Sequence, residues 1–128
     1  METENKKLIP NSYQTPNIVA DLLMADLDGA EFKILSYICR RTYGFHKDED
    51  QISLSQFICG VVSRQGKILD KGTGLTRPTV VLKLKLLTQA GALNTRSEGQ
   101  KRFYKLNLSM DTNKVVKKLN QLKNLTKT

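Results

Sequence analysis

Residues 72–80 read GTGLTRPTV, and the aliphatic run VLKLKLL follows directly at residues 81–87. This stretch can be either a phosphate-binding loop or the start of a helix. A P-loop requires G-x-x-x-x-G-K-[ST]. The nearest approach, GVVSRQGKI at residues 60–68, has one residue too many and an isoleucine where a magnesium ligand is needed. A dinucleotide fingerprint also fails, because Arg77 stands where the third glycine is required.

The same residues fit the start of a helix. Thr76 is placed to accept a hydrogen bond from a backbone amide of the first turn, and Pro78 falls inside that turn, where its missing N–H is tolerated. Gly74 lets the preceding turn close tightly. We therefore predict a helix from about Thr76 to Gly91. One side of it is expected to pack on two earlier helices through Val80, Leu84, Leu87 and Gly91.

The rest of the chain carries further signals of secondary structure. Asp28 with Glu31, and Ser53 with Gln56, have the spacing of a capping box, which predicts a helix after each pair. Gly44 suits the left-handed end of the first of these helices. The predicted elements are a short helix at 18–24, helices at 29–43 and 53–60, a minimal strand at 51–52, a small hairpin or loop at 61–72, two strands around the turn at 97–100, and a helix at 113–125 capped by Thr112.

Three helices followed by a two-stranded hairpin form the element order of a winged helix-turn-helix, a class in which the third helix enters the major groove of DNA. We predict a mainly α (α+β) fold with a two-stranded wing and extra N- and C-terminal helices. The expected organisation is a disordered arm at 1–14, a winged-helix domain at 15–108 and a basic amphipathic helix or tail at 109–128.

The charge of +9 is distributed unevenly. Residues 1–50 contain 6 Lys and Arg against 9 Asp and Glu, whereas residues 51–128 contain 15 against 3. The first part is therefore net −3 and the second net +12. Such asymmetry favours a polyanionic partner, here double-stranded DNA. The alternative is that the charge serves solubility alone.

Metal and cofactor chemistry are not expected. The chain has one histidine and two cysteines, Cys39 and Cys59, each beside aliphatic residues, so no zinc cluster or catalytic dyad can be assembled. We expect both cysteines to be buried thiols. Four aromatic residues are also expected in the core: Tyr37, Tyr43, Phe45 and Phe103. We predict no catalytic residue, no metal, no cofactor and therefore no enzyme.

No segment approaches the ~18 consecutive apolar residues of a membrane span. The N-terminus METENKKLIP is polar and lacks the apolar core of a secretory signal. We expect a cytoplasmic or nucleoid-associated protein with no membrane partner.

The candidate DNA-binding residues lie on the helix at 76–91, in the wing and in the connecting hairpin. Arg77 is placed either to read a guanine or to contact a phosphate. Lys83 and Lys85 are expected to contact the DNA backbone. Cations beside the wing turn suit backbone or minor-groove contact, or else form an ordinary charged edge strand. The full candidate set is Arg64, Lys67, Lys71, Thr76, Arg77, Thr79, Val81, Lys83, Lys85, Arg96, Lys101 and Arg102.

Leucines on two helices indicate a second surface. Leu82 and Leu86 fall opposite the packing side of their helix and can meet thymine methyls, a partner subunit or the last helix; we favour a second protein. The last helix has a stripe of Val115, Leu119 and Leu122 that can dimerise, fold back on its own domain or lie along DNA. We favour a homodimer, since repeated DNA sites suit dimers.

Several segments also resemble a known family: TPNIVADLLMADLDGAEFKILSYICRRTYGF at 15–45, ISLSQF at 52–57 and DKGTGLTRPTV at 70–80. They are similar to the N-terminal origin-binding domain of the phage replication protein O family, over roughly residues 15–107. The most specific pieces are PN at 16–17, RRTYGFHK at 40–47 and GTGLTRPT at 72–79.

The resemblance implies a winged helix that binds repeated sites at the replication origin of a phage or mobile element. It also implies a separate C-terminal part that recruits the replication machinery of the host cell, and we expect these 128 residues to lack that part. Two alternatives stay open. One is a transcriptional repressor on the same fold. The other is a protein-interaction module that binds a partner through Leu82, Leu86 and the last helix.

Overall fold

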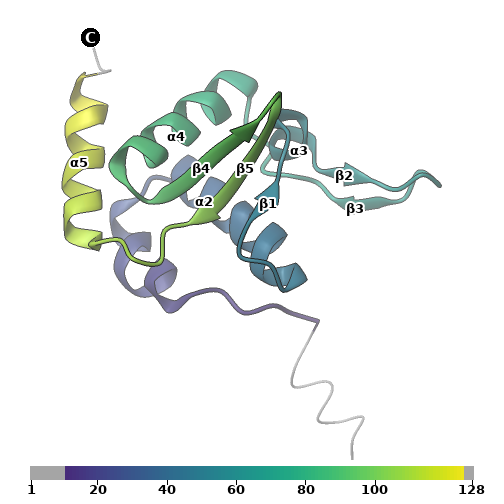
Figure 1. Cartoon of the computed structure of the whole chain (residues 1–128), viewed down its shortest axis with the longest axis horizontal. Coiled ribbons are helices and arrows are strands. Elements are labelled where there is room, and N and C mark those ends of the chain that lie inside the picture. The colour runs from purple at the N-terminus through teal and green to yellow at the C-terminus, as the bar shows by residue number, and fades with distance from the viewer. Residues whose placement is uncertain (1–10, 126–128) are drawn as a thin grey trace, which may run out of the picture.

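The computed structural model describes residues 11–125. Residues 1–10 of the predicted arm and 126–128 of the predicted tail lie outside the described residues. The mixed α+β class is confirmed (Figure 1). The elements are η1 (Val19–Leu23), η2 (Met24–Asp26), α2 (Gly29–Thr42), η3 (Tyr43–Phe45), β1 (Asp50–Gln51), α3 (Leu54–Cys59), β2 (Val61–Val62), β3 (Ile68–Asp70), α4 (Arg77–Ala90), β4 (Leu93–Glu98), β5 (Lys101–Leu106) and α5 (Thr112–Leu125).

The strands form two separate antiparallel sheets. β5 lies between β1 and β4 in the larger one, and β2 pairs with β3 in the smaller one. The tight β4–β5 hairpin follows α4 directly, so α4 and this hairpin are held side by side. The small β2–β3 hairpin instead projects from the body between α3 and α4 (Figure 1).

Local signals set most helix ends. Asp28 Oδ1 accepts a hydrogen bond from Glu31 N at 2.8 Å, and Glu31 Oε1 accepts one from Asp28 N at 2.9 Å, which confirms the capping box of α2. Ser53 and Gln56 cap α3 in the same way. Pro78 lies in the first turn of α4, and Gly91 ends that helix in the left-handed conformation with φ of 93°. Each of these interactions joins residues close in sequence, which is why the pattern alone predicts them.

Three predictions about helix ends were wrong. Thr76 occupies the N-cap position of α4, but its hydroxyl donates to Thr79 Oγ1 at 3.0 Å and caps no amide. Asp111, not Thr112, caps α5 through hydrogen bonds from Asn113 N and Lys114 N. After α2 the chain continues into η3, so the left-handed residue is His46 and not Gly44.

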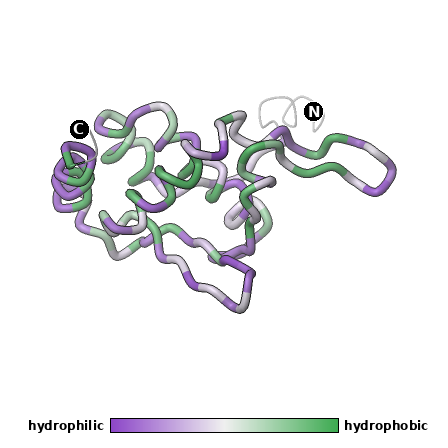
Figure 2. Tube along the Cα trace, turned by 90° about the horizontal axis from the view of Figure 1, so that it is seen from above, coloured by the Kyte–Doolittle hydropathy of each residue, from purple (hydrophilic) through white to green (hydrophobic). Residues whose placement is uncertain are grey.

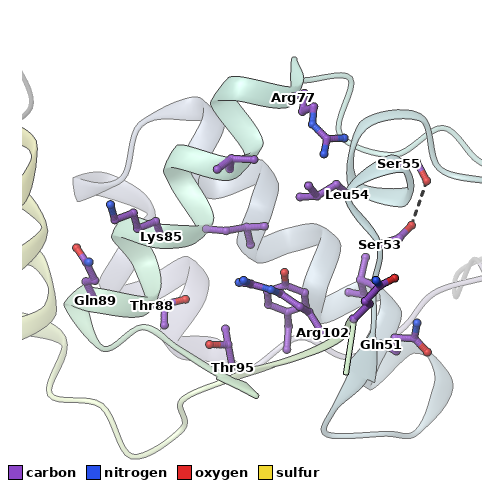
Figure 3. A pocket seen from close by; sticks show the side chains of 15 residues that line it. Gln51, Ser53, Leu54, Ser55, Arg77, Lys85, Thr88, Gln89, Thr95 and Arg102 are labelled. Carbon is purple, nitrogen blue, oxygen red and sulfur yellow. Dashed lines mark hydrogen bonds between the residues drawn. The ribbon is translucent and has the colours of Figure 1, made fainter. Parts of the chain in front are cut away.

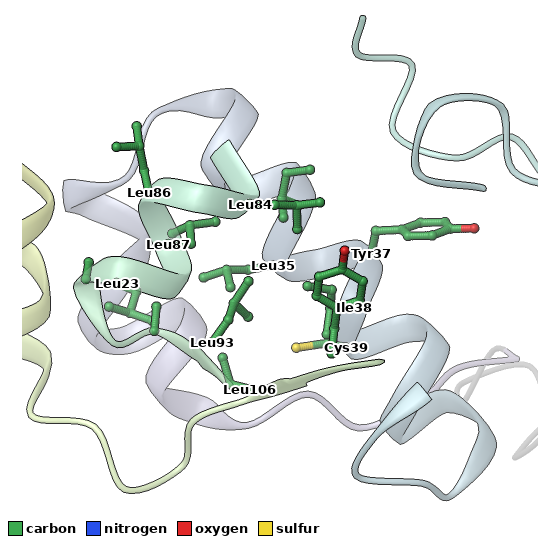
Figure 4. Packing of buried hydrophobic residues seen from close by; sticks show 14 of the residues in the cluster. Leu23, Leu35, Tyr37, Ile38, Cys39, Leu84, Leu86, Leu87, Leu93 and Leu106 are labelled. Carbon is green, nitrogen blue, oxygen red and sulfur yellow. The ribbon is translucent and has the colours of Figure 1, made fainter. Parts of the chain in front are cut away.

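The core lies between α2, α4 and the larger sheet. Ile34, Leu35 and Ile38 of α2 are fully buried and belong to the same cluster as Val80 and Leu87 of α4. Figure 4 shows leucines of α2 and α4 converging on Leu93 and Leu106 of the sheet. Each such side chain contributes roughly 1.5–3 kcal/mol when fully removed from water. The packing side predicted for α4 is confirmed.

Of the residues expected in the core, two lie at the surface and a third is only half-buried. Cys59 is exposed, whereas Cys39 is buried, and its burial raises the pKa of the Cys39 thiol to about 11. Phe45 is exposed and lies under the guanidinium groups of Arg40 and Arg41, at 4.8 and 4.7 Å from the ring centre. Phe103 is half-buried, and the guanidinium carbon of Arg96 lies 4.0 Å from the centre of its ring. Cation–π contacts thus replace part of the expected core packing.

The last helix folds back on its own domain. Val115 and Leu119 of α5 are buried in the same cluster as Leu86 of α4, and α5 lies beside α4 (Figure 1). The favoured role of these three residues, contact with a second protein, was therefore wrong. Leu86 is opposite the α2-facing side of α4, as predicted, but α5 covers that side. Leu122 is half-buried against the same cluster, and Leu82 is 40% exposed.

A charged cluster joins α2, α4 and α5, and we name it the acid–lysine cluster: Asp28, Glu31, Lys83 and Lys123. Glu31 is fully buried, and its Oε2 lies 3.1 Å from Lys83 Nζ and 2.9 Å from Lys123 Nζ. Asp28 Oδ2 lies 2.7 Å from Lys83 Nζ and 3.5 Å from Lys123 Nζ. Partial burial raises the pKa of Asp28, but the hydrogen bonds from Lys83 and from the Glu31 amide, with the positive charges of Lys83 and Lys123, lower it. The net effect is that the pKa of Asp28 is lowered.

The turn before α4 is packed against the end of α3. Thr73 donates to Phe57 O twice, from its backbone N at 2.7 Å and from its hydroxyl at 2.6 Å. Gly72 has φ of +71°, and a β-carbon there would lie 2.6 Å from Gly60 N. Gly74 has φ of +74°, but nothing lies within 4 Å of its β-carbon position. The two glycines therefore have similar backbone conformations, but only at Gly72 is the position of a β-carbon already occupied by neighbouring atoms.

We expect Gly72→Ala to lower the free energy of unfolding by about 3 kcal/mol, because backbone strain and a main-chain clash add together. Gly74→Ala, the matched control, should lower it by only about 1 kcal/mol, because it carries the strain alone. Urea unfolding followed by circular dichroism measures both values. Equal losses would show that Gly72 is not closely packed.

Candidate nucleic-acid interface

A groove of about 790 Å³ opens between α4, the β4–β5 hairpin and the segment that enters α3 (Figure 3). Its cations are Arg77 and Lys85 from α4 and Arg102 from β5. No Asp or Glu of residues 11–125 lines it. We name it the α4 groove. A concave surface with cations and without carboxylates suits a polyanion.

Helical geometry places one stripe of α4 in the groove. Arg77, Val81 and Lys85 follow each other at intervals of four residues, so they share a face of the helix. Thr88 and Gln89 continue this face one turn further on. Another side of the helix carries Val80 and Leu87 into the core and therefore fixes the direction of the stripe. Val81 is exposed in the groove among the polar side chains.

The three groove cations belong to no ion pair within residues 11–125. Arg77, Lys85 and Arg102 are all exposed. Their charges are therefore available to an external anion without the breaking of an internal salt bridge, which keeps the cost of binding low.

Two side chains that were predicted to contact DNA form ion pairs within the protein instead. The side chain of Lys83 is only 12% exposed and belongs to the acid–lysine cluster, so the expectation that it contacts the DNA backbone was wrong. Arg96 holds Glu49 through its Nε and Nη2, at 2.8–3.0 Å, and also pairs with Glu98. These partners raise the pKa of Arg96, and its charge is already compensated within the chain.

The other predicted residues lie outside the groove lining. Thr76 and Thr79 bond to each other at the start of α4. Lys101 is exposed beside the β4–β5 turn. Arg64, Lys67 and Lys71 are exposed on or beside the β2–β3 hairpin. Of the twelve candidates, the groove brings together Arg77, Val81, Lys85 and Arg102.

Sequence reasoning missed the neutral polar side chains of the groove. Thr88 and Gln89 could have been found by extending the Arg77 stripe along α4. The others come from β1, the N-cap and first turn of α3, and the β4–β5 hairpin, and only the fold brings them to α4: Gln51, Ser53, Ser55, Thr95 and Gln100. Hydroxyl and amide groups of this kind donate and accept hydrogen bonds, as base edges require.

A second groove, of about 1070 Å³, lies between residues 12–17 and the turn at 43–48. Arg40 contacts the ring of Tyr13 at 5.4 Å from its centre, which ties the first of these segments to α2. The PN and RRTYGFHK pieces of the sequence therefore meet in space.

In the part of the chain that the structure describes, no helix is long and apolar enough to cross a membrane. Nor do residues 11–125 contain a group of three or more His, Cys, Asp or Glu that could hold a metal ion.

Comparison with known proteins identifies a family. The family model for bacteriophage replication protein O matches residues 13–124. No curated protein and no solved structure matches the chain. The match spans most of the sequence, including α2, the α4 groove and α5. The chain therefore belongs to the bacteriophage replication protein O family.

Proposed function

We propose that this chain is a winged-helix domain that binds double-stranded DNA with sequence preference. In this interpretation α3 and α4 form the helix-turn-helix, α4 enters the major groove, and the β4–β5 hairpin is the wing. The observation that carries the proposal is the α4 groove, where Arg77 and Lys85 on the outward stripe of α4 and Arg102 of β5 form no ion pair within residues 11–125.

The groove residues divide into two roles. Lys85 and Arg102 neutralise phosphates, which supplies affinity without sequence information. Arg77, Thr88 and Gln89 lie on the stripe of α4 that would face base edges. A bidentate contact between arginine and guanine discriminates against the wrong base by about 1–3 kcal/mol. Val81 supplies an apolar surface of the kind that contacts thymine methyl groups.

We propose replication-origin recognition in the cytoplasm of the host cell as the biological role. Membership of the replication protein O family supports it, and the same membership supports a partner from the host replication machinery. Because Val115 and Leu119 are buried within the chain, these partners would have to bind elsewhere.

Capture of sheared phage and host DNA by the purified protein at ~0.15 M salt, followed by sequencing, tests the role. Clustered, repeated sites beside an A·T-rich tract are the expected result. Isolated sites over promoters would contradict origin recognition and indicate a repressor.

Arg77→Ala should weaken binding to the selected site more than binding to random duplex, because a base contact discriminates and a phosphate contact does not. Arg77→Lys is the matched variant, since it keeps the charge and loses the bidentate geometry. It should retain binding to random duplex and lose about tenfold of the preference for the selected site. Fluorescence anisotropy with both duplexes measures this. Equal losses on the two duplexes would make Arg77 a phosphate contact only.

A further inference from the structure

The β2–β3 hairpin exposes an unusual amount of apolar surface. Val62, Ile68 and Leu69 are 59%, 58% and 58% exposed, on a hairpin of ten residues. Figure 2 shows this hairpin extending from the body, with apolar strands and a polar tip. Val62 and Ile68 are directly opposite each other across the two strands, so their side chains share a face. Clustered exposed apolar residues mark binding surfaces, whereas scattered single ones need no explanation.

The base of the hairpin is held firmly. The carboxylate of Asp70 accepts hydrogen bonds from Tyr37 Oη at 3.0 Å and Gly72 N at 2.9 Å, and it lies 3.4 Å from Arg41 Nη1. Tyr37 and Arg41 belong to α2, which is part of the core. A polar clamp therefore fixes the direction of the hairpin relative to the α4 groove.

The charges on the hairpin identify its partner. Arg64, Lys67 and Lys71 are exposed and form no ion pair within residues 11–125. The single acidic residue of the hairpin, Asp70, is held by α2. The outer surface is thus apolar and cationic. Such a surface complements a duplex, whose minor groove has phosphate edges and apolar sugar walls and is often contacted by Leu and Ile side chains.

Its position in the chain agrees with DNA as the partner. Six residues, 71–76, connect β3 to α4; Lys71 is the first of them, and Arg77 is the first residue of α4. If α4 occupies the major groove, the next surface along the duplex is a minor groove. A partner protein would need acidic and apolar groups together, and nothing in the structure selects for one.

We infer that the β2–β3 hairpin is a second DNA-binding element. Its apolar face, Val62 and Ile68 with Leu69 beside them, packs against a minor groove next to the major groove read by α4, while Arg64 and Lys67 contact the flanking phosphates. This inference rests on the proposed function, because it requires a duplex on the α4 groove.

The double variant Val62→Ser with Ile68→Ser tests the inference. Both side chains are exposed, so the fold should be unchanged by circular dichroism. Leu108→Ser is the matched control, because Leu108 is 59% exposed on the loop between β5 and α5. The probe is a 60-bp duplex carrying a site selected by the wild-type protein from a randomised pool, with an A·T tract on each flank. Hydroxyl-radical footprinting and competition by netropsin, a minor-groove ligand, give the readout.

The wild type and Leu108→Ser should protect a flanking minor groove, and netropsin should remove that protection. The double variant should lose the flanking protection and bind about tenfold more weakly. Its salt dependence should be unchanged, because no charge has been removed. An unchanged footprint would overturn the hairpin contact alone. So would unchanged DNA binding with a loss of self-association in analytical ultracentrifugation, which would indicate a protein-binding surface. A wild type that binds no duplex would overturn the proposed function as well.

Discussion

Glu31→Gln should lower the free energy of unfolding by about 3 kcal/mol, because Lys83 and Lys123 would then share one carboxylate, Asp28, and one of the two partly buried positive charges would lose its partner. Glu31 is fully buried, and Lys83 Nζ and Lys123 Nζ both lie within 3.1 Å of its carboxylate. Glutamine can still accept the capping hydrogen bond from Asp28 N through its amide oxygen. Its NH2 group then takes the place of the oxygen that faces the two lysines, so the variant keeps the cap and removes the ion pairs. Urea unfolding at pH 7 measures the change.

Glu49→Gln is the control for this substitution. Glu49 also pairs with a basic side chain, Arg96, but at the surface, where solvent screens the attraction and the pair contributes little to stability, so this variant should lose much less than Glu31→Gln. Similar losses in the two variants would mean that the acid–lysine cluster does not hold α2, α4 and α5 together.

Acid titration of the wild type checks the same cluster. Because the folded pKa of Asp28 is below its ordinary value of 3.8, its contribution to stability is complete above that value. The contribution is lost as the pH falls through the lower folded pKa.

The triple variant Arg77→Ala, Lys85→Ala and Arg102→Ala should bind random duplex about 100-fold more weakly at 0.15 M salt. Each phosphate contact releases about 0.9 of a counterion. At this salt concentration, one such contact raises the affinity for the duplex roughly fivefold. On random duplex Arg77 has no selected guanine to read and contacts a phosphate instead, so three lost phosphate contacts multiply to about 100-fold in affinity. Anisotropy titration of a labelled duplex measures the affinity.

A second triple variant provides the charge-matched control. Lys114, Lys117 and Lys118 are exposed on α5, and their replacement by alanine removes the same charge from another face. The affinity of this control variant for random duplex should fall less than tenfold. Equal losses in the two triple variants would mean that net charge, and not the α4 groove, determines DNA binding.

The elements of this fold could be predicted from the sequence because their signals are local. The two capping boxes join residues three apart, and Gly91 ends α4 one residue after its last turn. The helical period of α4 likewise predicts that Arg77, Val81 and Lys85 share a face, because it depends only on spacing.

The errors concern partners that are distant in sequence. Lys83 is turned away from the groove by Asp28, 55 residues earlier, and Arg96 is held by Glu49, 47 residues earlier. Leu86 is covered by α5, whose position follows from the acid–lysine cluster and the aliphatic stripe together. Gln51 and Thr95 reach the groove only because β1 and β4 flank β5. Spacing along the chain carries no information about such contacts.

The salt dependence of duplex binding tests the central claim most directly. If the α4 groove, the wing and the β2–β3 hairpin engage about six to eight phosphates, the slope of log affinity against log salt should be about −5 to −7. Anisotropy titrations between ~0.05 and ~0.3 M salt give this slope. A slope near zero would contradict the proposal that this chain is a DNA-binding domain.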